Sequence, residues 1–182
     1  MTKILGISGS LRKASSNTGL LRALQALAPA HVTVDIATLH GIPLFNEDDE
    51  AATGKPAAVT ALDARIRAAD GIVFACPEYN FSIPGVLKNA TDWLSRGGSP
   101  FRWKRVGLVG AGGGQFVGTA RSQYHFRQNL QALQAITMPR PEIFVNHNEE
   151  KFDREGNLTD AETQRYLAKW LESFLEWVEK RP

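Results

Sequence analysis

Short apolar runs alternate along this chain with longer segments whose apolar residues recur at helical spacing. A short apolar run bounded by turn residues is typical of a buried strand, and a spacing of three to four is typical of an amphipathic helix. Strands separated by helices form βαβ units, whose parallel strands make a sheet covered on both faces. The acidic stretch between residues 41 and 56 is expected to be a solvated loop. The expected strands are 4–7, 32–37, 71–76, 106–110 and 142–145, and the expected helices are 19–27, 57–69, 86–95, 120–134 and 160–179, the last capped by Thr159.

This alternation predicts one α/β domain spanning residues 1–182. Right-handed crossover connections make such a sheet doubly wound. Five strands favour the order 2-1-3-4-5, a flavodoxin-like three-layer sandwich with helices on both faces. In that order a cofactor binds beyond the carboxyl ends of strands 1 and 3, where the direction of winding reverses. The loops at those ends therefore decide what the chain binds.

The composition excludes several classes of protein. A formal net charge of +2 over 182 residues is too small to indicate nucleic-acid binding. No apolar run approaches the length of a membrane span, and no signal peptide is visible at the start. A single cysteine, Cys76, allows no intramolecular disulfide and indicates a reducing compartment. We therefore expect a cytoplasmic protein that binds neither nucleic acid nor membranes, and we predict no metal site.

The first loop, residues 9–18, joins a strand to a helix and is crowded with hydrogen-bond donors. A helix N-terminus presents unpaired backbone N–H groups and a partial positive charge, both of which suit a phosphate. Arg12 adds a forked cation. An ordinary capped helix is the alternative interpretation, although it explains only one or two of these residues. The candidate phosphate ligands are Ser10, Arg12, Ser15, Ser16, Asn17 and Thr18.

The same loop lacks the patterns that bind larger phosphate groups. It contains neither the Gly-x-x-x-x-Gly-Lys-Ser/Thr of nucleoside-triphosphate sites nor the Gly-x-Gly-x-x-Gly of dinucleotide sites. A loop with few glycines and many hydroxyls is better suited to a terminal monophosphate that side chains surround.

The loops after the third and fourth strands indicate a flat ring. In residues 77–85, Tyr79 and Phe81 offer aromatic faces while Asn80 and Ser82 offer polar edges, as a planar heterocycle requires. A rigid turn whose aromatics only pack on neighbours explains this loop equally well. The loop 110–118 contains five glycines, which allow close approach of the backbone. A phosphate at one end and a flat ring at the other together describe flavin mononucleotide (FMN).

Several stretches of the chain resemble the NADPH-dependent FMN reductase family. They are 9–17 (Gly-Ser-Leu-Arg-Lys-Ala-Ser-Ser-Asn), 77–80 (Pro-Glu-Tyr-Asn) and 82–95 (Ser-Ile-Pro-Gly-Val-Leu-Lys-Asn-Ala-Thr-Asp-Trp-Leu-Ser). Residues 120–128 are similar to the helix after the fourth strand in the chromate and quinone reductase branch of that family. The resemblance covers nearly the whole chain in the right order. It implies FMN as cofactor and NADPH or NADH as co-substrate.

The resemblance also implies roles for individual residues. The phosphate would be held by Ser10, Arg12, Ser16 and Asn17, with Thr18 nearby, and the isoalloxazine ring would be lined by Pro77, Glu78, Tyr79 and Asn80, with Ser82 beside them. Family members commonly have a serine in the loop after the fourth strand that reaches the flavin. This chain has Gly112, Gly113 and Gly114 there, so the side-chain contact is lost and only a backbone contact can remain.

The implied activity is that of an FMN-dependent NAD(P)H oxidoreductase that passes electrons to quinones, azo compounds or chromate by a ping-pong mechanism. No catalytic side chain is predicted, because the cofactor carries the chemistry, and His125 is expected to be structural. Family members are dimers or tetramers, so residues 121–127 are either part of a contact between subunits or a solvated basic helix. The alternative functions are a flavodoxin-like electron carrier, which is usually strongly acidic, and a flavin-binding regulator without turnover.

Overall fold

The structure of the chain is a computed structural model that describes residues 1–114 and 117–180. Gln115 and Phe116, in the predicted glycine-rich loop, lie outside the described residues. Arg181 and Pro182, at the end of the predicted domain, also lie outside them.

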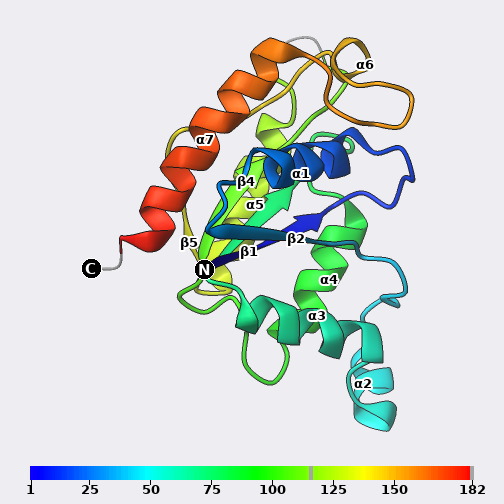
Figure 1. Cartoon of the computed structure of the whole chain (residues 1–182). Coiled ribbons are helices and arrows are strands. Elements are labelled where there is room, and N and C mark those ends of the chain that lie inside the picture. The colour runs from blue at the N-terminus through cyan, green and yellow to red at the C-terminus, as the bar shows by residue number, and fades with distance from the viewer. Residues whose placement is uncertain (115–116, 181–182) are drawn as a thin grey trace.

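A parallel sheet lies at the centre of the molecule, and its strand order is β2-β1-β3-β4-β5 (Figure 1). All four neighbouring pairs run parallel. The middle strand is buried along its whole length, as expected when both faces of a sheet are covered. This order confirms the predicted flavodoxin-like fold. The strands are β1 (Thr2–Ser8), β2 (Val32–Ala37), β3 (Gly71–Ala75), β4 (Arg105–Val109) and β5 (Ile136–Thr137).

Helices cover both faces of the sheet and complete a three-layer sandwich (Figure 1). Helices α1 and α7 lie on one face, and α3, α4 and α5 lie on the other. None of the helices in the described part of the chain is long and apolar enough to cross a membrane. The helices are α1 (Ser16–Leu27), α2 (Glu47–Thr53), α3 (Ala57–Ala68), α4 (Gly85–Ser95), α5 (Ala120–Ala132), α6 (Asn148–Lys151) and α7 (Ala161–Glu179).

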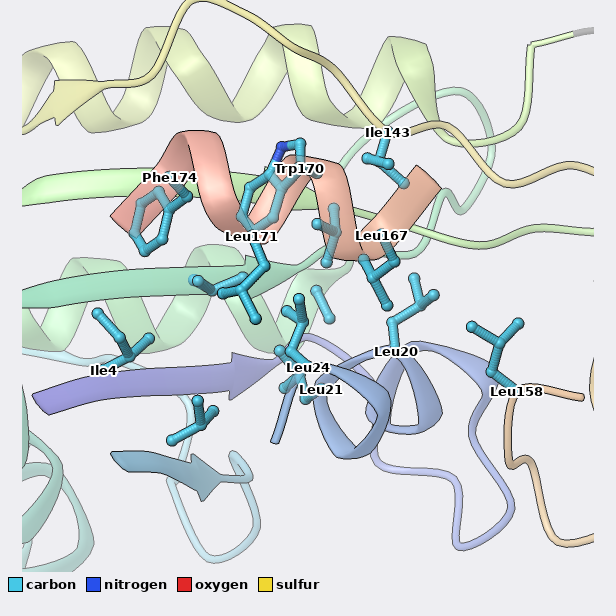
Figure 2. Packing of buried hydrophobic residues seen from close by; sticks show 14 of the residues in the cluster. Ile4, Leu20, Leu21, Leu24, Ile143, Leu158, Leu167, Trp170, Leu171 and Phe174 are labelled. Carbon is cyan, nitrogen blue, oxygen red and sulfur yellow. The ribbon is translucent and has the colours of Figure 1, made fainter. Parts of the chain in front are cut away.

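Two apolar clusters join the layers, because successive side chains of a strand point to opposite faces of the sheet. Ile4 of β1 belongs to the cluster under α1 and α7, whereas the next residue, Leu5, belongs to the cluster under α3, α4 and α5. Figure 2 shows the first cluster, in which leucines of α1 lie near Leu167 and Trp170 of α7. Full burial of a large apolar side chain contributes about 1.5–3 kcal/mol, so these clusters hold the helices against the sheet.

The fifth strand differs from the prediction. The sequence predicts it at 142–145, but β5 is Ile136–Thr137, which pairs with the beginning of β4. Val145 forms only an isolated parallel bridge, with Ala111 beyond the end of β4. The strand is two residues long, and Ile136 is 42% exposed at the sheet edge. So short and exposed a strand leaves no apolar alternation in the sequence, whereas residues 142–145, of which Ile143 and Val145 are buried, show the pattern of a strand without forming one.

Two polar segments also differ from the prediction. The stretch 41–56 contains α2 instead of being loop throughout: Asn46 caps this helix by accepting a backbone N–H, and acidic residues fill its first turn, where the helix dipole favours them. The cap of α7 is Asp160 and not Thr159. An oxygen of Asp160 accepts the N–H of Thr163 at 2.7 Å, while the Thr159 hydroxyl donates to a carbonyl elsewhere.

Candidate functional site

The three predicted loops begin side by side at one edge of the sheet. Parallel pairing brings the carboxyl ends of β1, β3 and β4 to the same edge. The pairing continues one residue beyond the strands, because the N–H of Gly9 donates to Ala75 and the N–H of Cys76 donates to Val109. The tertiary structure therefore brings the phosphate-binding and ring-binding candidates to neighbouring positions.

The first loop ends at the N-terminus of α1 with polar side chains turned inward. Ser15 is the cap, and its Oγ accepts the N–H of Thr18 at 3.3 Å. The Thr18 hydroxyl lies 2.8 Å from that of Ser8. No hydrogen bond within the described residues engages the backbone N–H groups of Ser16 and Asn17. Two free N–H groups at the positive end of a helix can bind an anion. The buried polar residues here are Ser8 at the end of β1 and, in the loop itself, Ser10, Ser15, Ser16 and Asn17.

Two of the predicted phosphate ligands already contact other parts of the protein. Asn17 Nδ2 donates to the Ala111 carbonyl at 2.8 Å, and its Oδ1 accepts the Ala111 N–H at 3.1 Å, so this amide ties α1 to the loop after β4. Asn17 can therefore reach a phosphate only through its backbone. Ser16 Oγ accepts from Asn148 Nδ2 at 2.9 Å and keeps its own proton to donate. Asn148 lies 132 residues further along the chain, and no sequence pattern indicates this contact.

Arg12 is the charged member of the first loop. It is exposed and takes part in none of the ion pairs found among the described residues. Together with Ser16 it lines a hollow of about 330 Å³, which Arg154 also lines. Two guanidinium groups near the free N–H groups of α1 suit a dianionic phosphate, and the acidic residues Glu149 and Asp153 line the same hollow beside them. Arg154 is a candidate that the sequence analysis does not identify.

The second loop forms a tight hairpin. Tyr79 and Ser82 exchange backbone hydrogen bonds of 3.0 Å, and the two residues between them, Asn80 and Phe81, have φ angles of 51° and 65°. Positive φ at both central positions is the type I′ turn, which asparagine tolerates but which costs about 1–3 kcal/mol for a bulky residue. The strained turn leaves Tyr79 49% exposed and Phe81 66% exposed. A large part of both rings is therefore open to solvent.

Helix α5 supports the hairpin. The carboxylate of Glu78 accepts from Arg121 at 3.0 Å and from a backbone N–H of α5 at 3.1 Å. The Arg121 guanidinium also lies 4.2 Å from the centre of the Phe81 ring. Ser82 Oγ and His125 Nδ1 are 3.1 Å apart. Because its carboxylate is engaged, Glu78 can face a bound ring only through its backbone.

A buried thiol lies directly beneath this loop. Burial raises the pKa of the Cys76 thiol to about 12, so it stays protonated at neutral pH. Its Sγ lies 3.0 Å from Ser122 Oγ, and that hydroxyl donates to the Pro77 carbonyl at 2.8 Å. Cys76 therefore helps to position the start of the hairpin and is not a nucleophile.

The third loop contains two kinds of glycine. A Cβ atom at Gly110 would lie 2.1 Å from Thr119 Oγ1 and 2.5 Å from the Cys76 carbonyl, so only glycine fits there. At glycines 112–114, a Cβ atom would come no closer than 3.4 Å to any described atom beyond the adjacent residues, and none of these φ angles is left-handed. Neither packing within the described residues nor backbone conformation requires glycine at these three positions. Their lack of side chains leaves this backbone open to a bound molecule.

These features fit FMN. The end of the site at α1 offers donors and cations for a phosphate. The hairpin offers two exposed rings, and Glu78, Asn80 and Phe81 line a hollow of about 380 Å³. Among the described residues, no group of three or more histidine, cysteine or acidic side chains could hold a metal ion.

Comparison with known proteins identifies the family. The model of the NADPH-dependent FMN reductase family matches residues 2–150, which is most of the chain. The chain therefore belongs to the NADPH-dependent FMN reductase family. It is an FMN-dependent oxidoreductase whose electron donor is NAD(P)H.

Individual relatives are similar over almost their whole length. The chain is 43% identical over 179 residues to an NAD(P)H-dependent FMN reductase of Pseudomonas aeruginosa, which covers 98% of this chain and 96% of that protein. It is 40% identical over 181 residues to a quinone reductase of Escherichia coli K12, again with 98% and 96% covered. The solved structure of FerB, a flavoenzyme NAD(P)H:(acceptor) oxidoreductase from Paracoccus denitrificans, has a TM-score of 0.87, 31% identity, and coverage of 99% of this chain and 98% of FerB.

Proposed function

We propose that this enzyme reduces quinones with electrons from NAD(P)H, and that both substrates use the same open face of the flavin in turn. The observation that carries this proposal is the strained hairpin, which holds Tyr79 and Phe81 exposed beside the phosphate-binding loop. An open aromatic surface suits flat small molecules better than a protein electron carrier. The similarity to a quinone reductase of Escherichia coli supports the same acceptor class.

The residues of the chain would bind and orient the cofactor. The free N–H groups of Ser16 and Asn17 would hold its phosphate, together with the Arg12 guanidinium. Two further N–H groups, those of Asn80 and Phe81 at the tip of the hairpin, have no partner among the described residues and would meet the polar edge of the ring. FMN, when bound, supplies the redox chemistry, accepting a hydride from NAD(P)H and passing electrons to the acceptor.

No side chain of the site is assigned a catalytic role. The carboxylate of Glu78 is held by Arg121 and by α5, and the Cys76 thiol remains protonated. His125 shares a hydrogen bond with Ser82 of the hairpin, so its role is to position that hairpin. The protein would contribute the position of the cofactor and, through backbone N–H groups, electrostatic stabilisation of the reduced ring.

Azo compounds and chromate are further proposed acceptors, because an open flavin face does not select one acceptor by shape. Anaerobic titration tests the whole proposal: NADPH should bleach the flavin absorbance, and a soluble quinone should then restore it. Initial rates at several quinone concentrations should give parallel double-reciprocal lines, the pattern of a ping-pong mechanism. A flavin that NADPH reduces but quinone does not reoxidise would favour a regulator or an electron carrier instead.

We further propose that the chain assembles as a homodimer or homotetramer in the cytoplasm. Tyr124 is half exposed on α5, close in sequence to Arg121, which lies over the exposed Phe81 ring. Exposed aromatic and arginine side chains in one place are typical of protein interfaces. Sedimentation in excess dithiothreitol should show at least a dimer. A 20 kDa monomer at micromolar concentration would contradict an interface at residues 121–127.

A further inference from the structure

A second hairpin, residues 152–158, follows α6 and lies against the beginning of α1 (Figure 1). Its ends are joined by an isolated antiparallel bridge between Phe152 and Leu158, which both belong to the apolar cluster under α1 and α7. Between them, both carboxylate oxygens of Asp153 accept hydrogen bonds from Asn157, at 2.7 and 3.0 Å. The 152–158 hairpin is therefore held in one shape by its own contacts, although it lies outside the three loops.

Two glycines let the tip of the 152–158 hairpin touch α1 directly. A Cβ atom at Gly19 would lie 1.8 Å from the carbonyl oxygen of Gly156, so a larger residue in α1 would push the hairpin away. Gly156 has a φ angle of 77°, and a Cβ atom there would lie 2.8 Å from the carbonyl carbon of Ala14. The tip therefore packs on the residues that lead into the free N–H groups of Ser16 and Asn17.

Arg22 of α1 holds the 152–158 hairpin in this contact. Its Nε donates to Asn157 Oδ1 at 2.8 Å, and its Nη2 donates to the carbonyl oxygens of Glu155 at 3.2 Å and Gly156 at 3.0 Å. The carbonyl of Gly156 is also the group that faces Gly19. Arg22 lies one turn of helix beyond Gly19, which places the two residues on the same side of α1. A single guanidinium group thus joins α1 to a segment 133 to 135 residues further along the chain.

The 152–158 hairpin carries Arg154 to the phosphate hollow. Arg154 is exposed and lines the hollow of about 330 Å³ together with Arg12 and Ser16. It takes part in none of the ion pairs found among the described residues. Arg22 does not line this hollow. A contribution of Arg22 to phosphate binding is therefore indirect, and the 152–158 hairpin is the element that links it to the hollow.

The position of Arg154 matters because the side-chain charges in the hollow balance. Its two arginines are matched by two carboxylates, those of Asp153 and Glu149. Asp153 is engaged by Asn157 within the 152–158 hairpin. Glu149 lies beside the third loop, where its Oε2 is 3.4 Å from the place of a Cβ atom at Gly113. An anion at the start of α1 therefore gains from Arg154 only while Arg154 is kept from pairing with Glu149.

We propose that Arg22 is a positioning residue for the phosphate of FMN. By fixing the 152–158 hairpin to α1, it holds Arg154 where Arg154 and Arg12 both bind the phosphate. This inference rests on the proposed phosphate site at the start of α1. It gives a segment outside the three loops a part in distinguishing FMN from riboflavin, which lacks the phosphate.

The test measures the Kd values of FMN and riboflavin for the full chain freed of flavin, by quenching of flavin fluorescence. Arg154→Gln should raise the Kd for FMN about five- to twentyfold, as expected for one exposed charge-assisted contact, and leave riboflavin unchanged. Arg22→Met keeps the aliphatic stem but cannot donate, and it should raise the Kd for FMN by no more than Arg154→Gln does, again sparing riboflavin. Because Arg22 acts through Arg154, the double variant should lose no more than Arg154→Gln alone.

Arg65→Met is the matched control. Arg65 also donates three hydrogen bonds between elements, two to Asp35 and one to the carbonyl of Ile36, but it joins α3 to β2 and does not line the hollow. It should bind both flavins as wild type does. Thermal unfolding shows whether each variant is folded. If Arg22→Met is not, Arg22→Lys replaces it, because an ammonium group keeps the charge but cannot serve all three acceptors.

Three results would overturn the inference. One is an unchanged Kd for FMN in Arg154→Gln or in the folded Arg22 variant. Another is an equal loss for both flavins in the Arg22 variant, which would make its role purely structural. The last is a double variant whose loss is the product of the two single losses. If Arg12→Ala lowers the preference for FMN over riboflavin while Arg154→Gln does not, only this inference fails; if neither does, the proposed phosphate site fails with it.

Discussion

Replacing Gly112 with alanine tests whether the loop after β4 lies against the flavin. A Cβ atom there would lie 3.4 Å from a methyl carbon of Thr119, which is an ordinary contact, and the backbone is not left-handed. Gly112→Ala should therefore fold as wild type does. It should even stabilise the apoprotein by about 0.4–1 kcal/mol, because alanine restricts the unfolded chain.

The expected effect falls on the cofactor instead. If the isoalloxazine ring lies against this backbone, the added methyl group occupies space that the ring needs. Overpacking of this kind costs about 1–3 kcal/mol, which corresponds to a rise of about 5- to 150-fold in the Kd for FMN. Gly110→Ala is the matched control, because its Cβ atom would lie 2.1 Å from Thr119 Oγ1 and 2.5 Å from a backbone carbonyl. That variant should lose stability before any effect on FMN can be measured.

Two assays on the apoprotein separate these effects. Thermal unfolding without FMN measures the stability of each variant, and the quenching of flavin fluorescence during titration measures the Kd. Unchanged stability with weaker FMN binding is the expected result for Gly112→Ala. Unchanged FMN binding would refute the contact between this loop and the flavin. A strongly destabilised Gly112→Ala apoprotein would refute the inference that packing within the protein does not require this glycine.

Three further predictions concern single side chains. Arg12→Ala should weaken FMN binding by about 1.5–3 kcal/mol, the range for a charge-assisted hydrogen bond, and leave riboflavin binding unchanged; equal losses for both flavins would make Arg12 structural. His125→Ala should keep the rate of flavin reduction by NADPH in anaerobic stopped-flow experiments, and a hundredfold slowing, about 2.7 kcal/mol of barrier, would reveal a catalytic residue that we have missed. Because burial raises the pKa of the Cys76 thiol from 9.0 to about 12, the folded state holds a proton that the unfolded chain loses in this range. Stability to urea should therefore fall as the pH rises above 9, by at most about 1.4 kcal/mol per unit from this group; a Cys76→Ala variant with the same slope would contradict this origin.

The layered fold could be predicted because the information for it is local in the sequence. Apolar periodicity shows which residues are buried, and the alternation of strands with helices restricts the sheet to very few orders. The same local pattern predicts that Ser15 and its neighbours lie at a helix N-terminus. The first backbone N–H groups of any helix have no partner within that helix, so this feature does not depend on distant residues. It fails at β5, whose two residues at the sheet edge carry no periodic signal.

Which atoms are left to bind a ligand was decided only by the tertiary structure. The sequence predicts Asn17 as a phosphate ligand, but its side-chain amide forms hydrogen bonds with the backbone of Ala111. The Ser16 hydroxyl accepts a hydrogen bond from Asn148, which lies far along the chain. The carboxylate of Glu78 is likewise taken up by Arg121. The sequence by itself determined the order of the sheet, four of its strands, the three loops and the kind of cofactor, because burial pattern and residue chemistry are properties of short segments. Hydrogen-bond partners are a matter of distance between remote residues, and those distances exist only once the chain has folded.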